Sequence, residues 1–104
     1  MPIESRILGF NRKEVVELLR EYCSQTGRSL PANFVENLTM VRGRPVTVKV
    51  RLDPDGSILE FGENELAAAI IMYCIKRGIP MARHALKSPE IAHDTLFLHL
   101  RMGP

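Results

Sequence analysis

Apolar residues recur at helical spacing in two segments of the chain, and each segment opens with signals of a helix start. The first segment covers 12–26 and follows Asn11, a residue type that caps helices by accepting a hydrogen bond from the backbone. Glu14 completes the spacing of a capping box, and Gly27 suits the left-handed conformation that ends many helices. The pattern therefore predicts a helix over 12–26 with one apolar face.

A second helix is predicted over 63–77, and it lacks the polar face of the first. Gly62 occupies the cap position, and Glu65 follows three residues later. Every residue of 66–75 is apolar, which is typical of a helix that is covered on most sides. We expect the sheet and the first helix, or another copy of the chain, to provide that cover.

Alternation of apolar and polar residues predicts the strands in the middle of the chain. Four apolar residues alternate with polar ones at 46–52, which is the clearest strand pattern. The Asp-Pro-Asp-Gly sequence at 53–56 predicts a tight turn into a partner strand at 57–61. A weaker strand is predicted within 34–41.

The last quarter of the chain predicts a second hairpin. Its strands are expected at 81–87 and 95–102, and its turn at 88–90, where the sequence is Ser-Pro-Glu. In the closing strand, alternate leucines face inward, and Phe97, His99 and Arg101 face outward.

These elements give the order α-β-β-β-α-β-β and an α+β fold class. Two helices with apolar faces need a sheet to cover, so we predict a mostly antiparallel sheet of four or five strands with both helices on one face. A length of 104 residues is that of a single domain, here residues 1–104.

Composition favours an ordinary soluble protein of the cytoplasm. Apolar residues make up 45% of the chain, charged residues 25%, and the formal net charge is +2. The N-terminus lacks the apolar region of a signal peptide, and the longest apolar run is half the length of a membrane span. Cys23 and Cys74 are then expected to be buried thiols in a reducing compartment.

One part of the surface is expected to be basic. The segment 42–51 has four cations and no acid, and the outer face of 95–102 adds further polar residues and one aromatic. If these two strands are neighbours, their outer face could bind phosphates and stack one base. The candidate residues for binding nucleic acid or a protein partner are Arg42, Arg44, Lys49, Arg51, Phe97, His99 and Arg101.

The sequence predicts no catalytic residue, no metal ligand and no cofactor. His84, His93 and His99 are too widely spaced for the tight ligand pairs of zinc sites. Neither cysteine lies near a histidine in the sequence, so no nucleophile and base are paired locally.

The C-terminal half resembles short bacterial proteins of unknown function. The resemblance is carried by Gly-Ile-Pro-Met-Ala-Arg at 78–83, which follows the second helix, and by the strand at 95–101. Both motifs are structural, so the resemblance implies no activity and no site residues.

These observations favour a small, non-enzymatic binding or regulatory module that binds itself or another protein. The uncovered apolar surface of the second helix, together with Phe97 on an outer strand face, favours a homo-oligomer. A nucleic-acid-binding module that uses the basic strand face is the second interpretation. A metal protein or enzyme that uses the late histidines is the third.

Overall fold

The computed structural model describes residues 4–28, 38–43, 45–52, 57–81 and 85–102. In chain order the elements are β1 (Glu4–Phe10), α1 (Arg12–Thr26), β2 (Leu38–Val41), β3 (Thr47–Leu52), β4 (Ser57–Phe61), α2 (Glu63–Lys76), β5 (Leu86–Ala92) and β6 (Thr95–Met102). The protein therefore belongs to the α+β class, as predicted.

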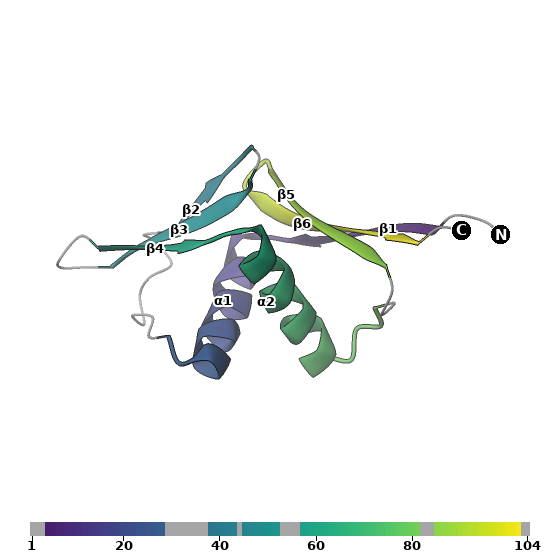
Figure 1. Cartoon of the computed structure of the whole chain (residues 1–104), viewed down its shortest axis with the longest axis horizontal. Coiled ribbons are helices and arrows are strands. Elements are labelled where there is room, and N and C mark those ends of the chain that lie inside the picture. Colours follow the sequence, from purple (N-terminus) through teal and green to yellow (C-terminus); the bar gives the residue numbers. More distant parts are fainter. Residues whose placement is uncertain (1–3, 29–37, 44, 53–56, 82–84, 103–104) are drawn as a thin grey trace.

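The strands form two antiparallel sheets, with the orders β1-β6-β5 and β2-β3-β4. In Figure 1 the two sheets are inclined to each other, and both helices lie on the same side of them. Helix α1 contacts β1 and β6, whereas α2 contacts β4 of one sheet and β5 of the other. The prediction of one sheet with four or five strands was wrong, because the described residues form two sheets of three strands each.

Both helices begin as predicted. The Asn11 side chain accepts a hydrogen bond from the Glu14 amide at 2.9 Å, and the Glu14 carboxylate accepts one from the Asn11 amide at 3.1 Å. Helix α1 ends at Thr26, and Gly27, which caps it, has a left-handed φ of 78°. Helix α2 ends at Lys76, one residue earlier than predicted.

The hairpin of β3 and β4 is confirmed, with Val48 opposite Phe61 and Val50 opposite Leu59. Its predicted turn at 53–56 lies outside the described residues. Within the predicted strand at 34–41, residues 38–41 form β2, and 34–37 lie outside the described residues.

The turn of the second hairpin was predicted in the wrong place. Ser88, Pro89 and Glu90 lie in the middle of β5, and Pro89 is opposite Leu98 of β6. Proline is tolerated there because β5 is an edge strand, which leaves one side of its backbone without a partner strand. The strand itself begins at Leu86 rather than at residue 81.

Strand β1 was not predicted at all. It pairs with β6 along its whole length, from Glu4 opposite Met102 to Phe10 opposite Leu96. Leu8 packs against the core, whereas Ile7 is exposed on the other side of the strand. Two consecutive apolar residues on opposite faces break the alternation that identifies a half-buried strand.

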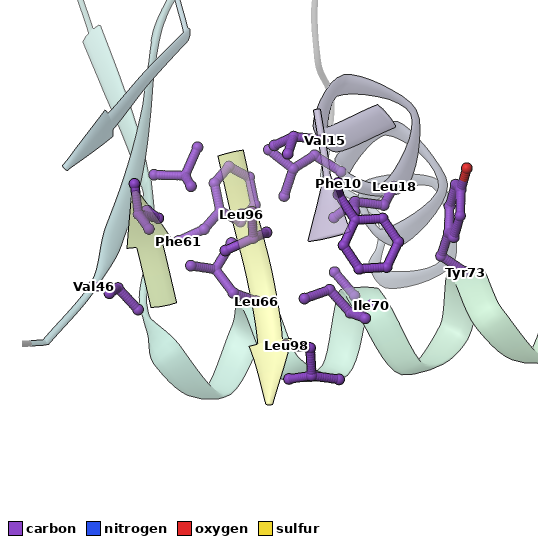
Figure 2. Close-up of a cluster of buried hydrophobic side chains, with 14 of the residues drawn as sticks. Phe10, Val15, Leu18, Val46, Phe61, Leu66, Ile70, Tyr73, Leu96 and Leu98 are labelled. Carbon is purple, nitrogen blue, oxygen red and sulfur yellow. The ribbon is translucent and has the colours of Figure 1, made fainter. Parts of the chain in front are cut away.

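A single hydrophobic core joins both sheets to both helices. Figure 2 shows Leu96 and Leu98 of β6 among side chains from α1 and α2, with Phe61 of β4 nearby. The Phe10 ring meets the Tyr73 ring edge to face, with centroids 5.6 Å apart. Alternate residues of β6 are therefore buried, as predicted, and the residues between them face away from the helices.

Candidate functional site

The predicted basic stretch lies on β3 and in the turn before it. Lys49 is opposite Glu60 of β4, and the distance from Lys49 Nζ to Glu60 Oε1 is 3.5 Å. Arg42 is exposed in the turn, and Arg51 belongs to β3, whereas Arg44 lies outside the described residues. The Glu60 carboxylate therefore offsets the positive charge at the centre of this sheet face.

The other predicted binding residues lie on the outer face of β6. His99 Nε2 is 2.7 Å from Glu90 Oε2 on β5, so the imidazole has an acidic neighbour across the strand pair. Phe97 is half-buried because its ring lies over Gly9 of β1, which has no side chain to displace it. Arg101 is exposed nearer the end of the strand.

These two groups of residues are on different sheets. Strand β3 is the middle strand of one sheet, and β6 is the middle strand of the other. The hypothesis of one basic face with an aromatic side chain required the two strands to be neighbours. The described residues thus place Lys49 and Arg51 on one sheet, and Phe97 and Arg101 on the other.

A pocket of about 700 Å³ lies where the two sheets approach each other. Three separate segments line it: the turn between β2 and β3, the start of α2, and the middle of β5. Among the residues that the structure describes, its charged lining residues are Arg42, Glu63 and Glu90. Its lining residues are Arg42, Gly43, Pro45, Val46, Glu63, Ser88, Pro89, Glu90 and Ile91. Sequence patterns gave no sign of this pocket, because its segments come together only through tertiary packing.

The histidines do not gather at one point in the described part of the chain. His93 is exposed in the turn after β5, and His99 pairs with Glu90 on the sheet face. His84 lies outside the described residues. Among the residues that the structure describes, no three His, Cys, Asp or Glu side chains form a group that could hold a metal ion.

Cys23 on α1 and Cys74 on α2 are buried, free thiols. Burial raises the pKa of the Cys23 thiol, and it raises the pKa of the Cys74 thiol as well. A raised pKa keeps both groups protonated, and the thiolate rather than the thiol is the nucleophile. The two cysteines are therefore suited to packing between the helices.

An ion-pair cluster joins the ends of the two helices. Arg77 donates hydrogen bonds of 3.0 and 2.7 Å to the two carboxylate oxygens of Glu21, and its guanidinium lies 3.5 Å from the centroid of the Tyr73 ring. The hydrogen bond from Arg77 holds the pKa of the Glu21 carboxyl below its ordinary value. This cluster fixes α2 against α1, which is a structural role.

The face of α2 that points away from the core is apolar. The outward positions of α1, at a spacing of 4, 3 and 4 residues, are polar or charged: Lys13, Glu17, Arg20 and Ser24. The same spacing on α2 gives one polar residue followed by apolar ones: Asn64, Ala68, Ile71 and Ile75. Ile75 is 72% exposed, and Ile71 is only half-buried. A helix face exposed to water is usually polar, so the outward face of α2 departs from the common pattern.

Comparisons with family models, with curated protein sequences and with solved structures found no match for this chain. The resemblance to short bacterial proteins therefore stays a prediction. Within the part of the chain that the structure describes, no helix combines the length and apolar character needed to cross a membrane.

Proposed function

We propose that this chain is a small, non-enzymatic binding module of the cytoplasm and that it acts as a homodimer. One observation carries the proposal: α2 has ten consecutive apolar residues at 66–75, and the fold buries only half of them. The buried residues are Leu66, Ala69, Ile70, Tyr73 and Cys74. The others face outward or sideways and are in contact with water.

A second copy of the chain is the simplest cover for this surface. In a dimer with two-fold symmetry the same patch occurs on both sides of the interface, so an apolar face covers an apolar face. Covering a large aliphatic side chain contributes about 1.5–3 kcal/mol, and symmetry doubles each contribution. The buried, protonated state of Cys23 and Cys74 supports the non-enzymatic and cytoplasmic parts of the proposal.

The molar mass in solution tests this function. Sedimentation equilibrium should show a mass that rises towards twice the 11.7 kDa of one chain as the protein concentration increases. The mass should fall again on dilution, since a dimer dissociates by mass action. A mass of one chain at all concentrations up to about 100 µM would contradict the proposal.

A further inference from the structure

The apolar residues on the outward face of α2 form a continuous stripe. Ala68, Ile71, Met72 and Ile75 recur at the spacing i, i+3, i+4 and i+7, which places them on one side of a helix. Over 66–75 no charged residue interrupts the stripe. Such a face is the kind that packs against another helix.

We infer that α2 packs antiparallel against α2 of a second copy, about a two-fold axis that passes between Ile71 and Met72. This inference rests on the proposed homodimer and names the surface that forms it. The axis places Ala68 opposite Ile75 of the second copy, and Ile71 opposite Met72 of the second copy. The small Ala68 side chain thereby meets the large Ile75 side chain, which allows the helix axes to approach to about 8–10 Å.

The charges that flank the stripe favour the antiparallel direction. Lys76 is exposed and lies one turn from Met72, at the edge of the stripe. The acid on the same side of α2, Glu65, is already paired with Arg28 of its own chain at 2.6 Å. A parallel pair would place Lys76 beside Lys76 of the second copy, which is repulsive. The antiparallel pair separates the two Lys76 residues by roughly 13 Å along the axis.

The outer face of the β1-β6-β5 sheet fits a second copy less well than the stripe does. Ile7 of β1 and Leu86 of β5 are both exposed, but β6 separates them and places Arg101 and His99 in between. The Phe97 ring is turned onto Gly9 rather than outward. Apolar groups on this face are therefore scattered among polar ones.

Two matched substitutions locate the interface. Ile75 and Leu86 are 72% and 73% exposed, but Ile75 lies on α2 and Leu86 on β5. Ile75→Lys should raise the dissociation constant of the dimer about tenfold or more, because the substitution places a charge in the interface twice. Leu86→Lys should leave the dissociation constant unchanged within about twofold. Circular dichroism of both variants checks that they fold like the wild type.

Cysteine cross-linking tests the direction and register of the helices. In the antiparallel pair, Ala68→Cys of one chain faces Ile75→Cys of another, close enough for a disulfide. Two copies of the same variant place their new cysteines about 10 Å apart along the axis. A mixture of the two variants should therefore form a disulfide-linked heterodimer under mild oxidation, and each variant alone should not. The native cysteines are 1% and 0% exposed and give no background.

The outcomes separate this inference from the proposed function. A dimer that tolerates Ile75→Lys but dissociates with Leu86→Lys would overturn the α2 interface and leave the homodimer intact. Cross-linking within each variant alone would overturn the antiparallel register. A wild-type protein that stays monomeric would overturn both the homodimer and its interface. Loss of the dimer with Ile75→Lys, together with cross-linking only in the mixture, would support the inference.

Discussion

His93 and Asp94 adopt left-handed backbone conformations, with φ of 51° and 56°, although neither is glycine. They are the two residues between Ala92 and Thr95, which are opposite each other in the hairpin of β5 and β6. A two-residue loop with positive φ at both positions is the turn that matches the twist of the flanking strands, and it favours Asn followed by Gly. The tight hairpin therefore requires an unfavourable backbone conformation at two residues that are not glycine.

Asp94→Gly should raise the free energy of unfolding by about 1 kcal/mol, because glycine enters this region without steric cost. The change removes an ion pair with Arg12 at 3.5 Å, but the Asp94 side chain is 62% exposed and surface pairs contribute about a few tenths of a kcal/mol. Asp94→Ala should lower the free energy of unfolding instead. Urea unfolding of both variants measures the difference, and equal stability of the two would contradict the role of backbone strain.

The two helices differ in how their first turns are capped. Asn11 provides a side-chain acceptor to α1, whereas Gly62 at the start of α2 has none. The Gly62 amide donates a 3.4 Å hydrogen bond to the Glu65 carboxylate. The Gly62 backbone is extended, and a Cβ atom there would meet nothing within 4 Å. Position 62 can therefore accommodate an asparagine side chain, which would cap α2 as Asn11 caps α1.

Asn11→Ala should lower the free energy of unfolding by about 1 kcal/mol, since it leaves a backbone amide of α1 without its acceptor. Gly62→Asn should raise it by a few tenths of a kcal/mol, which is the usual difference between glycine and asparagine at this position. Thermal unfolding followed by circular dichroism measures both changes. A stabilising effect of Asn11→Ala would show that the capping box contributes nothing here.

Elements with local signals were predicted correctly, and elements that depend on distant partners were not. Helix α1 and the hairpin of β3 and β4 are specified by caps and alternation within a few residues. Strand β1 has no such signal, because its place is fixed by β6 at the other end of the sequence. Pro89 suggested a turn because proline is common in turns, and only the edge position of β5 explains its place in a strand.

Candidate binding surfaces could likewise be predicted where the sequence signal is local, but not where they depend on distant segments. The apolar run of α2 is visible in the sequence and led directly to the outward stripe. The basic segment was also visible, but the pairing of Lys49 with Glu60 depends on the register between β3 and β4. The pocket between the sheets and the exposed Ile7 and Leu86 required the arrangement of both sheets, which local patterns do not contain.

At the scale of the whole molecule, one core holds two separate sheets together. Phe61 of β4 is fully buried, and its ring lies 6.4 Å from the ring of Tyr22 and 4.9 Å from the guanidinium of Arg28. The buried residues of β6 belong to the same core. Loss of packing in one sheet should therefore weaken the other sheet as well.

Phe61→Ala should lower the free energy of unfolding by about 3–5 kcal/mol, a large share of the stability of a domain of this size. Amide hydrogen exchange should become faster in β1, β5 and β6 as well as in β2, β3 and β4. Ile58→Ala, on the same strand but 57% exposed, is the control and should change exchange little. Faster exchange confined to β2, β3 and β4 would show that the two sheets unfold independently.

The pairing of β1 with β6 also affects how long β1 stays unpaired during protein synthesis. Glu4 is made before its partner Met102, and the 97 residues that lie between them must be made first. At typical rates of translation β1 waits roughly 5–20 s for its partner strand. During that interval the apolar side chains of Leu8 and Phe10 have no β6 beside them, so these residues stay exposed until the last strand of the sheet has been made.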